Sequence, residues 1–209
     1  MAEMQTAGTV ATSTLQPTMA SNLVRQTALV VAGSVLVAIC AHISIPLLFT
    51  PVPLTMQNFA VLLLGLLMEP AAVFASMALY LIEGASGLPV FTPHGPGGLL
   101  QLLGPSGGFL LAYPFVAAFV SLLARRIRPV RFTTLAFSAA AASLFLYLCG
   151  AAWFTVVSHM SLASTLKMTV LPFLPGDALK VVAAGAIAIS VMKLRKRSGS
   201  ERASQTSAL

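Results

Sequence analysis

Long apolar segments, separated by short polar or Pro- and Gly-rich segments, are the feature that most limits how this chain can fold. A helix needs about 20 mainly apolar residues to cross the hydrocarbon core of a bilayer. Only 8% of the 209 residues are charged, whereas soluble domains usually carry about 25%. Mean hydropathy is +0.92. The sequence therefore predicts an all-α integral membrane protein embedded in a lipid bilayer.

Six of these apolar segments predict six transmembrane helices, because each is bounded by residues that end a helix. They cover residues 23–43, 54–68, 71–82 (or as far as 88), 109–123, 132–157 and 170–192. The predicted membrane domain spans residues 23–193. We expect residues 1–22 to form a disordered cytoplasmic tail, since they lack the features of a typical signal peptide. Residues 194–209 are predicted to form a basic and polar cytoplasmic tail.

Basic residues are unevenly distributed between the two faces of this predicted bundle. Arg25, the arginines of 125–131 and the bases of 193–197 fall on one face, and Lys167 falls on the other. An excess of Lys and Arg marks the cytoplasmic side of a membrane protein. Both termini are therefore predicted to be cytoplasmic. The net charge of +7 then reflects the cytoplasmic ends of helices, not a nucleic-acid partner.

The stretch from Tyr80 to Pro114 crowds glycine and proline between two apolar segments. Within the membrane, a broken backbone is tolerated only where protein or a water-filled cavity satisfies its polar groups. Three irregular segments, 44–53, 89–103 and 158–169, fall on the outer face of the predicted topology. Their coincidence predicts an outward-facing substrate pocket.

Asp177 and Lys180 are ionisable residues within the sixth predicted span. Inserting a charged side chain near the bilayer centre costs roughly 2.5–3.5 kcal/mol of free energy. A charged residue at this depth is therefore expected to have a structural or functional role. Their spacing of three places both on one helix face, about 18–23 Å from the inner end of the helix. One interpretation is an ion pair that anchors the helix end. The other is a ligand-binding pair, in which Lys180 meets an anionic group and Asp177 accepts N–H donors.

Other polar and aromatic residues near the outer ends of the spans are candidate ligand contacts. Gln57 and Asn58 could pair with an amide or urea of a ligand, or form interhelical hydrogen bonds. Glu83 could contact a ligand or a loop donor. Aromatic residues at this level could form pocket walls or pack internally: Tyr80, Phe91, Phe109, Tyr113 and Trp153. Cys40 and Cys149 lie in apolar segments, which favours a role as small apolar fillers over a disulfide or metal site.

Residues 104–107 have the G-x-S-G form used by intramembrane serine proteases of the rhomboid type. Those enzymes need a histidine base in a later span, within hydrogen-bond reach of the serine. The histidines here are His42, His94 and His159, and none lies in the sixth predicted span. The glycines more simply allow a tight loop and a close helix approach.

Several motifs, in this order and spacing, resemble the BioY family, the biotin-binding S components of energy-coupling-factor (ECF) transporters. They cover about residues 25–192 and comprise Pro51-Val52-Pro53 with Thr55-Met56-Gln57, Tyr80, Gly84-Ala85, Gly87 to Phe91, Gly97-Gly98, Leu103-Gly104-Pro105, Gly107-Gly108-Phe109 and Asp177-Ala178-Leu179-Lys180. The last of these matches the D-x-x-K motif of the family's final helix. Phe109 stands where the family often has Tyr, and position 83 is variable in the family.

The resemblance implies six helices, a high-affinity biotin pocket near the outer face, and binding roles for Asp177 and Lys180. Biotin offers a carboxylate, a urea ring and an apolar thioether body, which suits a pocket with one cation, amide partners and apolar walls. If Lys180 meets the carboxylate, Lys180→Ala should weaken binding of biotin more than binding of a biotin amide. We expect a non-enzymatic component for biotin uptake across the bacterial cytoplasmic membrane. The alternative is a carrier component for another small vitamin or anion.

The resemblance implies energising partner subunits. The sequence contains no nucleotide-binding G-x-x-x-x-G-K-[ST] loop, so any ATP-driven uptake must use such partners. No cofactor is expected, and ATP would be used only by ATPase subunits of a partner module. Ala28 and Ala32 form a small-xxx-small face, which could pack internally or against a partner helix. The resemblance implies that this face docks on the transmembrane coupling subunit. The sequence leaves open whether the protein also forms a homo-oligomer.

Overall fold

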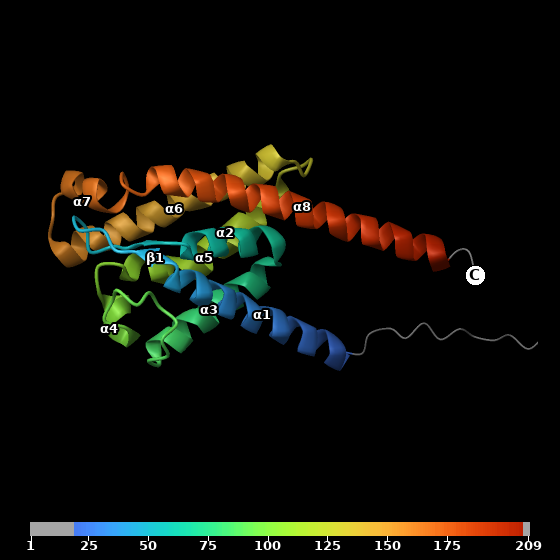
Figure 1. The fold of residues 1–209 in the computed structure, drawn as a ribbon, viewed down its shortest axis with the longest axis horizontal. Helices are drawn as coiled ribbons and strands as arrows, with labels where there is room; N and C mark the ends of the chain where they lie inside the picture. Colours follow the sequence, from blue (N-terminus) through green and yellow to red (C-terminus); the bar gives the residue numbers. More distant parts are fainter. Residues whose placement is uncertain (1–18, 207–209) are drawn as a thin grey trace, which may run out of the picture.

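The computed structural model describes residues 19–206, which form a helical bundle (Figure 1). The longer helices are α1 (Met19–His42), α2 (Gln57–Leu67), α3 (Pro70–Ala85), α5 (Gly107–Arg126), α6 (Phe132–Ser158) and α8 (Leu174–Thr206). The short elements are β1 (Ser44–Ile45), β2 (Leu54–Thr55), α4 (Gly98–Leu103) and α7 (Leu162–Thr169). Within this part of the chain, α1, α5, α6 and α8 are long and apolar enough to cross a membrane, whereas α2 and α3 are shorter.

The helix boundaries differ from the sequence-based expectation at both ends of the chain. Helix α1 begins at Met19, so residues 19–22 are helical, and the rest of the predicted N-terminal tail lies outside the described residues. Helix α8 continues to Thr206 through most of the predicted C-terminal tail. Lys, Arg, Ala and Glu in this extension are good helix formers, so a polar composition does not end the helix. The loops at 89–103 and 158–169 contain α4 and α7, which are too short to show an apolar period.

The longer helices pack in a ring in the order α1, α3, α5, α6, α8 and α2, and α2 returns to α1. Helix α2 also contacts α5 and α6 across the ring. In the most apolar part of α5, 67% of the residues are buried, whereas in that of α1 only 22% of the residues are buried. Helix α1 therefore leaves much of its apolar surface on the outside of the bundle.

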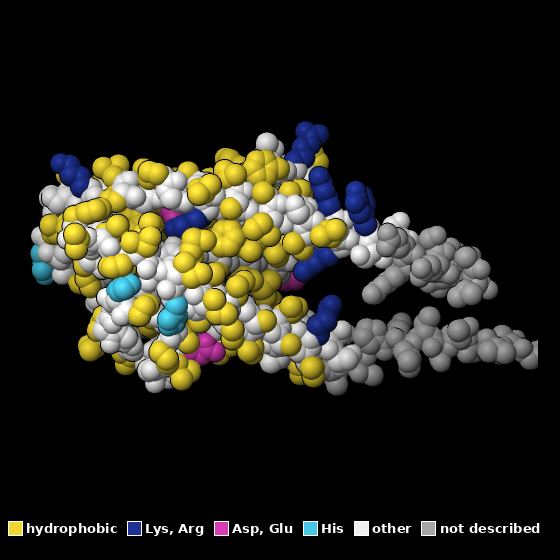
Figure 2. All heavy atoms as spheres, viewed as in Figure 1, with side chains coloured by type: hydrophobic (Ala, Val, Ile, Leu, Met, Phe, Trp, Pro, Cys, Tyr) yellow, Lys and Arg dark blue, Asp and Glu magenta, His cyan; other side chains and the backbone are white. Residues whose placement is uncertain are grey.

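The two ends of the bundle differ in character. Helix α1 begins and α8 ends at the same end, while the β1–β2 hairpin, α4 and α7 lie at the opposite end (Figure 1). Lys and Arg side chains gather where the terminal segments leave the bundle, and hydrophobic atoms cover much of the flank between the ends (Figure 2). Exposed apolar side chains of this kind suit a lipid environment better than water.

Two close contacts fix the position of the first residues of α5 against α4 and α6. A Cβ atom at Gly107 would lie 1.9 Å from the carbonyl oxygen of Leu102, and one at Gly108 would lie 2.2 Å from Cβ of Trp153. Trp153 Nε1 also donates a hydrogen bond to the carbonyl oxygen of Gly104 at 2.9 Å. The glycines thus permit the close approach of α5 and α6 expected from the sequence.

Candidate ligand-binding site

A cavity of about 560 Å³, partly open to the surroundings, lies inside the bundle toward the end with the hairpin, α4 and α7. Its lining comes from the β1–β2 loop and β2, α2, the α3–α5 connection, α5, α6, α7 and α8. The lining residues are Val52, Pro53, Thr55, Gln57, Asn58, Thr92, Gln101, Ser106, Phe109, Leu110, Tyr113, Leu146, Tyr147, Thr169, Phe173, Asp177 and Lys180.

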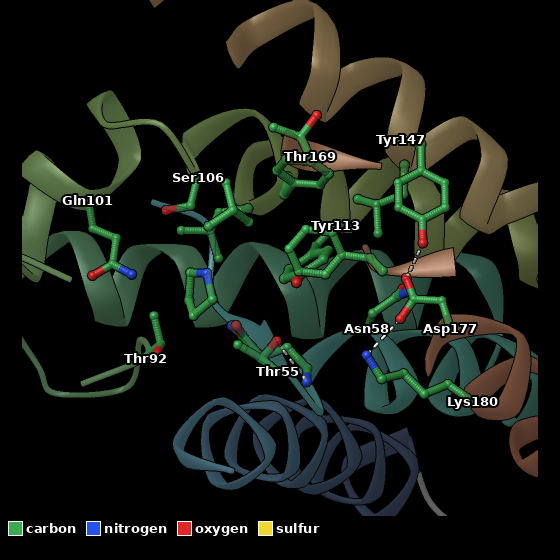
Figure 3. A pocket seen from close by; sticks show the side chains of 17 residues that line it. Thr55, Asn58, Thr92, Gln101, Ser106, Tyr113, Tyr147, Thr169, Asp177 and Lys180 are labelled. Carbon is green, nitrogen blue, oxygen red and sulfur yellow. Dashed lines mark hydrogen bonds and ion pairs between the residues drawn. The ribbon is translucent and has the colours of Figure 1, made fainter. Parts of the chain in front are cut away.

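One end of this cavity holds a hydrogen-bonded cluster around Asp177 (Figure 3). Lys180 Nζ lies 2.6 Å from Asp177 Oδ1. The other carboxylate oxygen accepts hydrogen bonds from Tyr147 Oη at 2.6 Å and from Asn58 Nδ2 at 3.1 Å. Asp177 and Lys180 are only 7% and 8% exposed. Helices α2, α6 and α8 therefore meet through one buried polar network.

This cluster has no net charge but retains both donor and acceptor capacity. Lys180 can donate up to two further hydrogen bonds, because an ammonium group carries three N–H bonds. The Oδ1 atom of Asn58 is buried and has no hydrogen-bond partner among the described residues. A buried polar atom without a partner costs about 1–3 kcal/mol, which a bound ligand with an N–H donor would offset. The cluster is thus suited to a neutral group with donors and an acceptor side by side.

The middle and the opposite end of the cavity have a different chemistry. Tyr113 lies between the two ends (Figure 3). Apolar and aromatic side chains from the hairpin loop, α5, α6 and the residue before α8 line the cavity as well: Val52, Phe109, Leu110, Leu146 and Phe173. Gln101, Thr92 and Ser106 lie at the end farthest from Asp177 (Figure 3). The cavity therefore runs from a charged but neutralised cluster, past an apolar body, to uncharged hydrogen-bonding groups.

Five of the eight predicted ligand contacts line this cavity: Gln57, Asn58, Tyr113, Asp177 and Lys180. They come from α2, α5 and α8, so only the tertiary packing brings them together. Phe109, an aromatic candidate of the sequence analysis, lines the cavity as well.

The structure does not bring Tyr80, Phe91 and Glu83 into the cavity lining. Tyr80 is fully buried behind the wall, where its hydroxyl accepts from Gln57 Nε2 at 2.5 Å and donates to the carbonyl oxygen of Val90 at 3.1 Å. Phe91 packs edge-on against the Tyr80 ring, with the ring centroids 5.3 Å apart. These two residues support the wall from behind, because no residue of α3 belongs to the cavity lining.

Glu83 faces a separate groove on the flank between α1 and the segment after α3. Its carboxylate accepts a hydrogen bond from the hydroxyl of Ser34 on α1. Glu83 thus makes a contact with a neighbouring helix instead of the loop donor considered from the sequence. Trp153 also lies outside the cavity lining, at the interface of α5 and α6.

The sequence analysis missed several residues of the lining. Tyr147 lies in the middle of an apolar span, and its hydroxyl was the one signal that could have identified it. Gln101 and Thr92 lie in the Pro- and Gly-rich segment that was expected to line a cavity, but no spacing singled them out. Ser106 was considered only as a nucleophile. None of the three histidines lines this cavity, and no hydrogen bond joins Ser106 to a histidine among the described residues.

The remaining candidates lie away from the cavity. Ala28 and Ala32 are exposed on α1, so in this chain their face is not covered by a neighbouring helix. Cys40 is buried and Cys149 is partly buried, and both are free cysteines. Residues 19–206 contain no group of three or more side chains that could hold a metal ion.

Comparisons with known proteins agree on one family. The sequence profile of the BioY family matches residues 7–197. The probable biotin transporter BioY of Bacillus subtilis is 36% identical over 144 residues, which are 68% of this chain and 76% of that protein. The probable biotin transporter BioY of Pyrococcus horikoshii is 35% identical over 164 residues, which are 78% of this chain and 94% of that protein.

A solved structure has the same fold. The crystal structure of the S-component for biotin from an ECF-type ABC transporter superposes with a TM-score of 0.76 at 25% sequence identity. The match covers 82% of this chain and 93% of that chain.

Proposed function

This chain belongs to the BioY family, and we propose that it binds biotin in the cavity described above and serves as the substrate-binding S component of an ECF-type transporter. Family membership makes it a membrane transport protein, not an enzyme, which removes the protease alternative. The observation that carries the proposal for the site is the neutral cluster of Asp177, Lys180, Asn58 and Tyr147 at one end of an otherwise largely apolar cavity.

The chemical groups along a biotin molecule occur in the same order as the complementary groups along this cavity. A cyclic urea carries two N–H donors beside a carbonyl acceptor. Asn58 Oδ1 and the Asp177 carboxylate can accept the donors, and Lys180 can donate to the carbonyl. The thioether ring and alkyl chain then lie against the aromatic and aliphatic middle of the cavity. The carboxylate lies toward Gln101, Thr92 and Ser106.

This orientation differs from the expectation that Lys180 meets the carboxylate of biotin. Lys180 is already paired with Asp177 at 2.6 Å, so the cluster offers no uncompensated positive charge. A ligand carboxylate placed there would also lie close to the Asp177 carboxylate, and like charges in a poorly solvated site repel strongly. The urea end of biotin carries no charge and avoids this repulsion.

The finer topology belongs to the same proposal. We take the six longer helices as six membrane spans, with both termini in the cytoplasm and the cavity facing outward across the cytoplasmic membrane. The gathering of Lys and Arg at the end where both terminal segments leave the bundle supports this orientation (Figures 1 and 2). The exposed Ala28 and Ala32 supply a surface on which a coupling subunit can dock, and ATPase subunits would supply the energy.

Equilibrium binding of radiolabelled biotin to the purified protein in detergent tests this function. We expect saturable binding of one biotin per chain, and competition by unlabelled biotin but not by other small vitamins. A folded protein that binds no biotin, or that binds another vitamin more tightly, would refute the proposal. Uptake of labelled biotin by cells that also express the energising module tests transport separately.

A further inference from the structure

A second pocket adjoins the uncharged end of the cavity. It contains about 520 Å³ of free space, part of it open to the surroundings, and lies among the loops at the outer end of the bundle. Its lining consists of Pro51, Pro53, Thr92, His94, Gly95, Pro96, Gln101, Gly104, Pro105 and Ser106. We call it the outer pocket. Four residues belong to both linings: Pro53, Thr92, Gln101 and Ser106. These shared residues form the boundary between the two spaces.

The boundary contains no charged side chain. Its polar groups are the hydroxyls of Thr92 and Ser106 and the side-chain amide of Gln101. A hydroxyl or amide N–H can donate to the oxygen of a carboxylate or of an amide alike. A site built on a cation would instead distinguish a carboxylate strongly from a neutral amide, because charge-assisted hydrogen bonds are about twice as strong. The boundary is therefore expected to discriminate only weakly between a ligand carboxylate and a neutral amide.

Gln101 lines both the cavity and the outer pocket. Its side chain is 2% exposed, and its Oε1 atom accepts a hydrogen bond from the backbone N–H of Gly97 at 3.1 Å. Gly97 has a positive φ of 69°, a conformation that glycine adopts without strain. The Gln101 side chain is therefore held from the loop side by one neutral hydrogen bond.

We propose that the ligands of this protein include neutral amides of biotin whose amine substituent extends into the outer pocket. This inference rests on the proposed function and on the orientation that places the carboxylate at the uncharged end. A short alkyl amine on the amide would pass between Pro53, Thr92 and Gln101. The ring end, which makes the specific hydrogen bonds, would bind as it does in biotin.

Competition binding tests the inference with three ligands: biotin, its primary amide and its N-propyl amide. We expect both amides to bind the wild-type protein within about tenfold of biotin, since the loss is at most one neutral hydrogen bond. His94→Trp should fill the outer pocket, because His94 lines that pocket and does not line the cavity. This variant should bind biotin as the wild type does and should lose at least tenfold in affinity for the N-propyl amide. The matched variant His94→Ala should keep all three affinities.

The outcomes separate this inference from the proposed function. If biotin binds tightly and both amides bind more than a hundredfold more weakly, the inference is overturned while the proposed function stands. If the N-propyl amide binds but His94→Trp does not change its affinity, the outer pocket does not hold the substituent, and the inference is equally overturned. If none of the three ligands binds to folded protein, the proposed function fails and the inference fails with it.

Discussion

Removing the charge of Lys180 should weaken ligand binding and also destabilise the fold, and the two effects can be separated. In Lys180→Met, Asp177 keeps only its neutral donors on Tyr147 and Asn58. Both charged side chains are 9% exposed, so the remaining carboxylate stays buried without a cation. Breaking a buried pair in this way costs about 3–5 kcal/mol of folding free energy. Loss of one charge-assisted hydrogen bond to the ligand, about 1.5–3 kcal/mol, corresponds to roughly a 10- to 150-fold weaker affinity.

The double variant Asp177→Asn with Lys180→Met removes both charges and leaves no orphan carboxylate. Because a buried ion pair is often replaceable by neutral groups of similar size, we expect its thermal unfolding midpoint to return close to the wild-type value. Its biotin affinity should stay low, since the donor on Lys180 is still missing. Thermal unfolding in detergent and equilibrium titration with labelled biotin would measure the two quantities on the same samples.

Binding of the primary amide of biotin decides which end of the ligand Lys180 meets. If Lys180 contacts the urea, Lys180→Met should weaken biotin and its amide by the same factor. If the amide is affected much less than the acid, Lys180 meets the carboxylate and our orientation is wrong. A double variant that binds biotin within twofold of wild type would show that the pair only anchors the fold. Arg125→Gln serves as the control, because the Arg125–Glu69 pair is 42% and 70% exposed and such surface pairs contribute only about 0–1 kcal/mol.

Three other substitutions have defined expectations. Tyr147→Phe removes the hydroxyl that donates to the buried carboxylate of the cluster at 2.6 Å, and should lower biotin affinity about tenfold or more in the same titration. Gly108→Ala would place Cβ 2.2 Å from the tryptophan side chain on α6. The resulting overpacking should cost about 1–3 kcal/mol of folding free energy and lower the unfolding midpoint. The control Gly176→Ala, whose Cβ would have an ordinary contact at 3.7 Å, should leave the midpoint unchanged. Replacing Ala28 and Ala32 by Trp should preserve biotin binding but abolish co-purification with the energising module and uptake; unchanged uptake would exclude this docking face.

Much of the helical architecture follows from the sequence because a lipid environment imposes a simple rule. Each span must satisfy its backbone hydrogen bonds internally and must present about 20 apolar residues. The boundaries of α6, predicted at 132–157 and found at Phe132–Ser158, show how closely apolar length alone can locate a helix. Helices α2 and α3 are shorter than this length. The rule also fails for α4 and α7, which are short and lie among loops, and for the polar extension of α8.

The candidate site was only partly predictable, since sequence spacing relates residues on one helix but not on different helices. Asp177 and Lys180 could be paired from their spacing of three. Tyr147 lies 30 residues from Asp177, and Asn58 lies 119 residues from it; no spacing rule connects them. Tyr80 is a candidate from the sequence as an aromatic residue near the outer end of its span, but the packing of α3 places it behind the wall.

The sequence by itself determined that this chain is a helical membrane protein with an irregular, Pro- and Gly-rich end, and that its last span carries a charge pair. Composition and local spacing suffice for these conclusions, because the bilayer selects for apolar length and penalises isolated charge. Only the tertiary structure decided that Lys180 is neutralised within a cluster from three helices, and that Glu83 faces the flank. It also decided that Gln101 lines both the cavity and the outer pocket. The physical reason is that a helix face acquires its role from the helices that pack against it, and those contacts join residues far apart in the chain.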